Sequence, residues 1–161
     1  MNLKEYNLCV DQYADNIYRF VLKNLKDRDD SKDIVQDTFE KLWKKHKEID
    51  SGKVKSYLFA SAYHTMIDWL RKTNRQEAIS PTEAKKHHYS PHYYDVGEIL
   101  NLALSKLPAD QKSVILLRDY EGYSYKEISD ITNLSETQVK VYIYRARLSL
   151  KNYLVSIETL V

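Results

Sequence analysis

The chain has 161 residues, of which 43% are hydrophobic and 30% charged, and its formal net charge is +2. This length allows one domain or two small ones, and no apolar run approaches the roughly 20 residues that span a membrane. The single cysteine, Cys9, excludes an internal disulfide. The N-terminal residues lack the apolar centre of a signal peptide, so we expect a cytoplasmic protein.

Three amphipathic helices are expected in the first part of the chain. Apolar residues recur at helical spacing over residues 8–25, and a second helix is expected to be capped by Asp29, Asp30 or Ser31. This second helix has an apolar face that includes Phe39. Its opposite face carries three acids and an amide, at Asp33, Gln36, Asp37 and Glu40. A polar bend at residues 48–53 then precedes a third helix over residues 54–72.

Basic and aromatic side chains gather on and just before the third helix. The candidate nucleic-acid contacts in this region are Lys53, Lys55, Tyr57, His64, Arg71, Lys72 and Arg75. Aromatic rings stack on exposed bases while cations hold the phosphate backbone, so this composition suits single-stranded DNA. Phe59 and Trp69 are expected to be core residues, and Tyr57 and His64 are the better candidates for DNA contact.

A polar segment with two prolines, residues 76–97, is expected to be a flexible linker between domains at 1–75 and 98–161. Its histidines, His87, His88 and His92, could suggest a metal site. Zinc sites usually need three or four rigidly held ligands, which a linker does not supply. We therefore expect no metal, no cofactor and no catalytic residue.

The second domain is expected to hold four helices. The first spans residues 99–107 and ends at Pro108, and the second spans residues 110–121 and ends at Gly122. Residues 125–131 and a longer helix capped by Ser135 flank a tight turn, which is the pattern of a helix-turn-helix. The fold class predicted is all-α, with two small helical domains joined by the linker.

The last helix of this pattern is expected to enter a DNA groove. Val139, Ile143, Ala146 and Leu150 form an apolar stripe that should pack on the preceding helices. The candidate DNA contacts lie at its start and around its other faces, at Ser135, Thr137, Gln138, Lys140, Val141, Tyr144 and Arg145. Such side chains can reach base edges and phosphates in the major groove.

The segment ALSKLPADQKSVILLRDYEGYSYKEISDITNLSETQVKVYIYRARLSLKNYL resembles the region-four domain of extracytoplasmic-function (ECF) sigma factors of the sigma-70 family. Upstream, DDSKDIVQDTFEKLWKK is similar to the family's core-polymerase-binding helix in region two. VKSYLFASAYHTMIDWLRKTNRQ is similar to its promoter-melting helix. The matches occur in the family's order and cover nearly the whole chain.

The resemblance implies roles that the residues alone do not. It implies that Asp33, Gln36, Asp37 and Glu40 bind core RNA polymerase. It implies that the bend and third helix read and melt the −10 promoter element, and that the last helix reads the −35 element. Promoter DNA and an anti-sigma factor are further implied partners, with no small-molecule substrate. Tyr57 and His64 stand where the family commonly has Trp and Asn, which leaves the −10 preference open.

The residues by themselves also allow two other functions. A helix-turn-helix regulator that acts without core polymerase would form a stable dimer on a palindromic operator. A metal-dependent enzyme built on the acidic helix and the histidines has little support, because no His or Cys completes a known ligand spacing near Asp33–Glu40.

Overall fold

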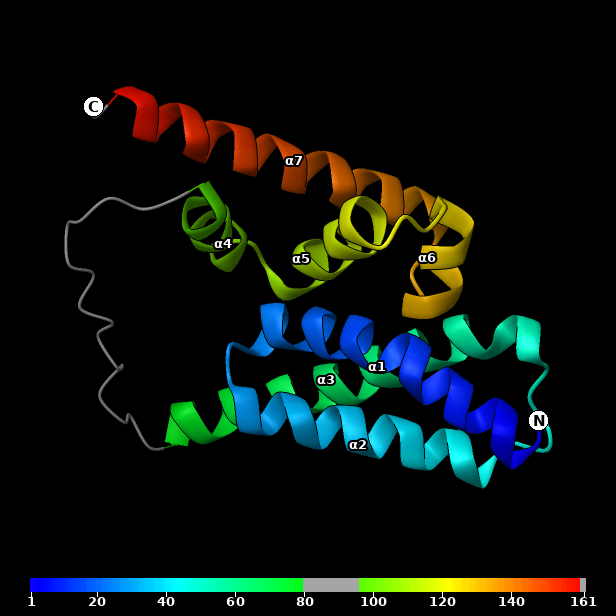
Figure 1. The fold of residues 1–161 in the computed structure, drawn as a ribbon. Coiled ribbons are helices and arrows are strands. Elements are labelled where there is room, and N and C mark those ends of the chain that lie inside the picture. The colour runs from blue at the N-terminus through cyan, green and yellow to red at the C-terminus, as the bar shows by residue number, and fades with distance from the viewer. Residues whose placement is uncertain (80–95, 160–161) are drawn as a thin grey trace.

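A computed structural model describes residues 1–79 and 96–159, with side chains placed for residues 1–74 and 96–157. Its helices are α1 (Leu3–Leu25), α2 (Arg28–Lys44), α3 (Val54–Ile79), α4 (Val96–Ser105), α5 (Ala109–Ile115), α6 (Tyr125–Thr132) and α7 (Glu136–Thr159). A 3-10 turn at Ser51–Lys53 precedes α3, and a π-helical turn at Leu116–Tyr120 continues α5. Every regular element in these ranges is helical, which confirms the all-α prediction. Figure 1 shows α1–α3 in one unit and α4–α7 in another.

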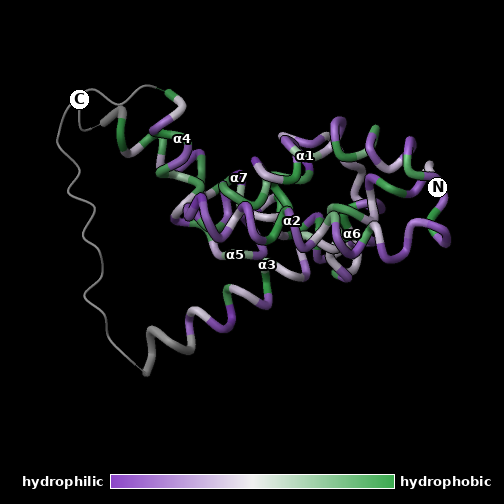
Figure 2. Tube along the Cα trace, turned by 60° about the horizontal axis from the view of Figure 1, so that its bottom comes forward, coloured by the Kyte–Doolittle hydropathy of each residue, from purple (hydrophilic) through white to green (hydrophobic). Residues whose placement is uncertain are grey.

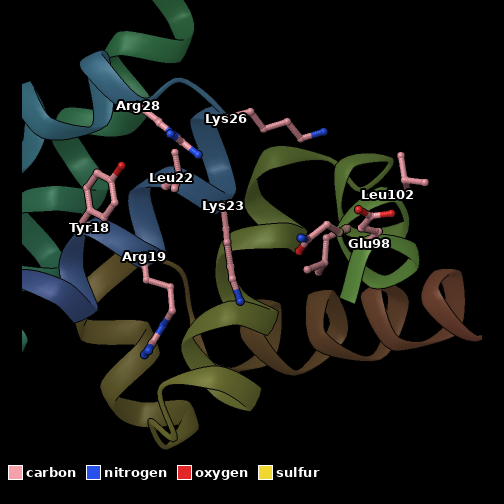
Figure 3. A pocket seen from close by; sticks show the side chains of 10 residues that line it. Tyr18, Arg19, Leu22, Lys23, Lys26, Arg28, Glu98 and Leu102 are labelled. Carbon is pink, nitrogen blue, oxygen red and sulfur yellow. The ribbon is translucent and has the colours of Figure 1, made fainter. Parts of the chain in front are cut away.

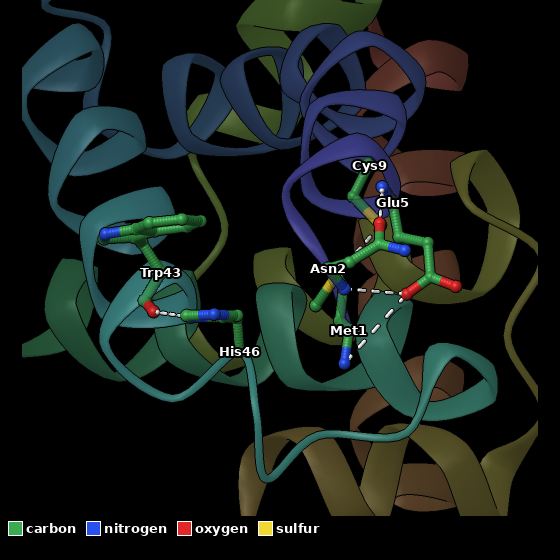
Figure 4. Close-up of polar contacts among 6 residues, drawn as sticks. All are labelled: Met1, Asn2, Glu5, Cys9, Trp43 and His46. Carbon is green, nitrogen blue, oxygen red and sulfur yellow. Dashed lines mark hydrogen bonds and ion pairs between the residues drawn. The ribbon is translucent and has the colours of Figure 1, made fainter.

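The first helix begins earlier than its apolar periodicity predicts. Asn2 Oδ1 accepts a hydrogen bond from the Glu5 N–H at 2.8 Å, and Glu5 Oε2 accepts one from the Asn2 N–H at 2.9 Å (Figure 4). This reciprocal cap satisfies donors that a helix start leaves unpaired, so α1 begins at Leu3. It ends at Leu25 because Lys26 adopts the left-handed conformation, with φ 60°.

The second helix is capped by Asp27, which lies before the three residues predicted for that role. Asp27 Oδ1 accepts a hydrogen bond from the Asp30 N–H at 2.9 Å. Ser31 is instead buried, and its hydroxyl donates to the Asp27 carbonyl at 2.6 Å. The left-handed residue Lys26 reverses the chain immediately before Asp27, which places the cap at the first position after the turn.

The third helix continues beyond its predicted end. It runs through Ile79, so the predicted linker over residues 76–97 begins in helix, and α4 starts at Val96. Residues 80–95, including His87, His88 and His92, lie outside the described residues. Phe59 is fully buried as expected, whereas Trp69 is half-buried.

Turn residues set the helix boundaries of the second unit. The predicted stop at Gly122 is confirmed, and its φ of +75° is one that a glycine adopts without strain. Ser124 then caps α6, since its hydroxyl oxygen accepts from the Glu127 N–H at 3.1 Å. Asn133, with φ 61°, ends α6 in the left-handed conformation and leads into the turn before α7.

A single hydrophobic core runs through both units. The ring of Tyr123 is buried against Phe59 of α3, with ring centroids 5.4 Å apart in an edge-to-face arrangement. The amide oxygen of Asn24 in α1 accepts a buried hydrogen bond from the Ser113 hydroxyl of α5 at 3.1 Å. The second unit therefore covers part of the first, with α6 packed along α3.

Hydrophobic and hydrophilic residues are interspersed along each helix, as Figure 2 shows. This pattern buries one face of each helix and leaves the other in solvent. Among residues 1–79 and 96–159, no helix is long and apolar enough to cross a membrane.

Candidate functional site

The start of α7 is fixed by a reciprocal cap between two predicted DNA contacts. Ser135 Oγ accepts from the Gln138 N–H at 3.1 Å, and Gln138 Oε1 accepts from the Ser135 N–H at 3.0 Å. The predicted capping role of Ser135 is thus confirmed. The cap uses one of the two lone pairs of the Gln138 amide oxygen, so the other lone pair and the amide N–H groups can still contact another molecule.

The two faces of α7 differ as the sequence predicts. Val139, Ile143 and Ala146 are buried against the preceding helices, and Leu150 is half-buried. The outward side is solvent-exposed and carries Thr137, Lys140, Val141, Tyr144 and Arg145. Because a helix with one packed face and one free face can lie in a groove, α7 has the geometry of a recognition helix.

A pair of contacts that the sequence did not reveal holds α7 against the π-helical turn. Asp119 accepts two hydrogen bonds from the Arg147 guanidinium, at 2.7 Å from Nη2 and 3.3 Å from Nε. This bonding raises the pKa of Arg147 above its ordinary value. Beside it, Arg118 donates to the Tyr123 carbonyl at 2.8 Å. The bidentate pair fixes the orientation of α7 relative to the rest of the unit.

One exposed face of α3 collects most of the predicted −10 contacts. Lys53 precedes the helix, and Tyr57, His64 and Arg71 follow at spacings that return to the same side of it. His64 and Arg71 are exposed, and Tyr57 is half-buried, with its ring partly packed on the core. The side chain of Arg75 lies outside the described residues.

Lys55, also predicted as a −10 contact, lies on a different side of α3. Its ammonium lies 4.6 Å from the centroid of the Tyr123 ring, on the side of α3 that the second unit covers. Two residues along a helix correspond to about 200°, which places Lys55 away from Lys53 and Tyr57. Lys72 is exposed but lies about 100° from Arg71.

The polar face of α2 carries its own counterions. Asp37 pairs with Lys41 at 3.0 Å and Glu40 with Lys44 at 3.2 Å, each one helical turn apart. The remaining two predicted residues, Asp33 and Gln36, are exposed and have no polar partner in the described part of the chain. Surface pairs of this kind contribute little to stability, so the carboxylates remain available to a partner.

Trp43 lies beside this face and was not predicted as a functional residue. Its side chain is 41% exposed although it stacks on His46, with centroids 4.3 Å apart and rings 8° from parallel (Figure 4). Tyr6 contacts the same indole edge-on at 5.0 Å. An exposed, immobilised Trp next to polar residues is typical of a protein-binding surface. Periodicity placed Trp43 on α2 but gave no signal for this exposure.

Charged and aromatic contacts join the two units around the residues before α6. Arg19 of α1 donates to Glu121 at 2.9 Å, and the Glu121 side chain is only 5% exposed. The Lys23 ammonium lies 3.6 Å from the centroid of the Tyr120 ring. Together with Tyr123, these side chains make the segment from the end of the π-helical turn to the start of α6 a polar and aromatic link between the units.

A cavity of about 740 Å³ opens between the end of α1, the start of α2 and the helix α4 (Figure 3). Its walls combine apolar side chains with four cations and one acid, from Tyr18, Arg19, Leu22, Lys23, Lys26, Arg28, Glu98, Asn101, Leu102 and Leu104. Apolar surface beside an excess of positive charge suits a segment that is both apolar and acidic.

Lys112 of α5 is a buried cation close to this region. It is 7% exposed and has no hydrogen-bond or ion-pair partner among the described residues. Burial, with a smaller contribution from the positive charge of Lys26, lowers its pKa from 10.5 to about 8. An unpaired ammonium in this position destabilises the folded chain at neutral pH.

Metal ligands do not cluster in the part of the chain that the structure describes, where no group of three His, Cys, Asp or Glu side chains could hold an ion. The histidines considered from the sequence lie outside that part. The described surfaces are instead an outward helix-turn-helix, an aromatic and basic helix face, and a polar helix face. An outward helix-turn-helix is typical of DNA-binding transcription proteins.

Comparison with known families identifies both units. Residues 9–76 match the family Sigma-70 region 2, and residues 97–150 match the family Sigma-70, region 4. The ECF RNA polymerase sigma factor SigM of Bacillus subtilis is 33% identical over 86% of this chain and 88% of its own. The RNA polymerase sigma factor SigV of the same organism is 30% identical, over 86% and 84% of the two chains.

A solved structure has the same fold. The sigma factor RpoE of Bartonella quintana, in complex with the anti-sigma factor NepR, superposes with a TM-score of 0.80 at 25% identity. The match covers 94% of this chain and 98% of that one. The chain therefore belongs to the ECF sigma factors of the sigma-70 family. Its function is that of a transcription initiation factor that directs RNA polymerase to promoters.

Proposed function

We propose that three surfaces divide the work of this sigma factor. The polar face of α2 binds core RNA polymerase, the exposed face of α3 reads and holds the −10 strand, and α7 reads the −35 duplex. The observation that carries this division is their separate placement on α2, α3 and α7, each with an exposed face of suitable chemistry. The two functional domains are residues 1–75 and 98–161, and the protein acts in the cytoplasm without a catalytic step of its own.

Binding to polymerase would use the four residues of α2 together with Trp43. Asp33, Gln36, Asp37 and Glu40 offer carboxylates and an amide that complement a basic surface. Trp43 adds an apolar contact that these four polar residues do not supply. Its side chain is exposed, and Tyr6 and His46 hold it in place. Buried aromatic anchors surrounded by polar residues provide most of the free energy in many protein interfaces.

Binding of the −10 strand would use Lys53, Tyr57, His64 and Arg71 on one face of α3. The rings can stack on unpaired bases while the cations hold phosphates, and no ATP is needed because binding offsets the cost of unstacking. In this structure the two units are packed together, and Lys55 contacts Tyr123 instead. Separation of the two units would expose Lys55, but on the side of α3 away from Tyr57.

An anti-sigma factor is a further partner we propose. RpoE of Bartonella quintana has the same fold and is bound to such an inhibitor. The cavity beside α4 is lined from both units, and its cations Arg19, Lys23, Lys26 and Arg28 would attract an acidic segment. A partner bound there would hold the units together and keep Lys55 covered.

Two charge substitutions test the division of labour. Asp37→Arg should weaken binding to bacterial core polymerase by about tenfold or more, because it places a cation in an acidic surface, and should leave −35 duplex binding intact. Arg145→Ala should have the opposite profile. It should weaken duplex binding, reduce the slope of log affinity against log salt concentration by about one, and leave polymerase binding unchanged. Both affinities would be measured for each variant. If both variants lost the same activity, the assignment of α2 and α7 to different partners would be wrong.

A further inference from the structure

The outward edge of α7 is apolar over three helical turns. Val141 is 38% exposed, Tyr144 68% and Leu148 45%. With Thr137, they recur at alternating spacings of three and four residues, so they form one stripe along the helix. Contiguous apolar side chains left in solvent usually mark a contact surface. A helix that binds DNA only through phosphates and base hydrogen bonds would not need this stripe.

Two polar side chains beside the stripe already have partners in the fold. Gln138 Oε1 accepts from the Ser135 N–H, and its second lone pair and its amide N–H groups remain exposed. Arg147 is held by Asp119. Arg145 is exposed and has no polar partner within the described ranges. It is therefore the cation best placed to reach a guanine edge or a phosphate.

The major groove offers one apolar group on its base edges, the C5 methyl of thymine. Resting on the proposed function, which places α7 in the −35 duplex, we propose that Val141 is a specificity residue that reads thymine through this methyl group. Val141 lies centrally on the stripe, with Arg145 one turn further along. A second copy of the chain is a poorer occupant, because it would bring Arg145 and Lys140 against a surface that is itself cationic.

Replacing thymine by deoxyuridine tests this inference directly. Deoxyuridine keeps the hydrogen-bonding groups of thymine and lacks only the methyl. The probes are −35 duplexes that the complex of this chain with bacterial core polymerase selects from a random pool, with thymines replaced one at a time. At one or two positions the affinity of the wild-type complex should fall about threefold to fourfold, the effect of removing one buried methyl.

The variant Val141→Ala should bind the unmodified duplex more weakly and lose its sensitivity to deoxyuridine at those positions. Val155→Ala is the matched control, because Val155 is 48% exposed on the same helix but lies well beyond the turns assigned to the groove. It should behave like the wild type. Both side chains are exposed, so neither change should affect folding, which circular dichroism would verify.

Two results would overturn the inference: a wild-type complex indifferent to deoxyuridine at every position, or a Val141→Ala complex with undiminished sensitivity. In both cases the complex still selects a common −35 sequence, and the proposed function stands. A complex that selects no common sequence at all would contradict the placement of α7 in the −35 duplex, and both proposals would fall.

Discussion

The buried cation Lys112 gives a quantitative prediction about stability. Burial lowers its pKa from 10.5 to about 8, a difference that corresponds to about 3 kcal/mol between its two protonation states. Replacing Lys112 by Met removes the charge and keeps an unbranched chain of similar size. We expect Lys112→Met to raise the free energy of unfolding at pH 7 by up to about 3 kcal/mol.

The same shift fixes the sign of the pH dependence. The folded chain releases the Lys112 proton near pH 8, whereas the unfolded chain keeps it to about pH 10.5. Between these values the unfolded state binds more protons, so this residue makes the wild type more stable as pH rises. Below about pH 8 both states are protonated, and the full penalty remains. The gap between Lys112→Met and wild type should therefore be constant below pH 8 and shrink towards pH 10.5.

Urea unfolding followed by circular dichroism at several pH values would measure this gap. Subtracting the free energy of unfolding of the wild type from that of the variant at each pH removes the contribution of tyrosines and other lysines that titrate in both proteins. Lys126→Met is the matched control, because Lys126 is exposed in the same unit, and its stability should stay within about 0.5 kcal/mol of the wild type. A Lys112→Met variant that is less stable than the wild type at pH 7, or a gap that does not change with pH, would show that the charge of Lys112 does not destabilise the folded chain.

Two further predictions concern the N-terminal cap of α7 and the packing of the two units against each other. Ser135→Ala removes the oxygen that accepts from the Gln138 N–H, so we expect a loss of about 1 kcal/mol in urea unfolding. An unchanged midpoint would show that the cap does not stabilise α7. Glu121→Arg replaces the partner of Arg19 by a like charge and should separate the two units. Spin labels on Cys9 and on a Lys126→Cys substitution should then report longer and broader distances than in the otherwise unchanged labelled chain. An identical distance distribution would mean that this ion pair does not hold the units together.

The helix-turn-helix was predictable because its determinants are local. Ser135 and Gln138 have the spacing of a reciprocal cap, and Gly122 and Pro108 mark helix boundaries in the sequence itself. Helix ends were predicted less well where the cap lay outside the apolar pattern, as at Asn2 and Asp27. In both cases a polar residue extended the helix by a turn or moved its start, without any change in hydrophobic spacing.

Features that depend on packing between distant segments were not predictable. Lys55 was grouped with Lys53 because both are basic and close in the chain, yet Tyr123 covers one and leaves the other exposed. The pairing of Arg147 with Asp119 and the exposure of Trp43 also depend on how helices pack. Periodicity identifies which face of a helix is apolar, but it does not identify the segment that covers that face.

Run-off transcription tests whether the chain acts as a sigma factor. Purified chain would be mixed with bacterial core polymerase and a library of promoter fragments from a bacterium that encodes this sequence. We expect discrete transcripts that depend on the chain and start downstream of paired −35 and −10 elements. We also expect Asp37→Arg to abolish them. Normal binding of the chain to DNA, combined with no complex with core polymerase and no chain-dependent transcript, would contradict the claim that it acts as a sigma factor.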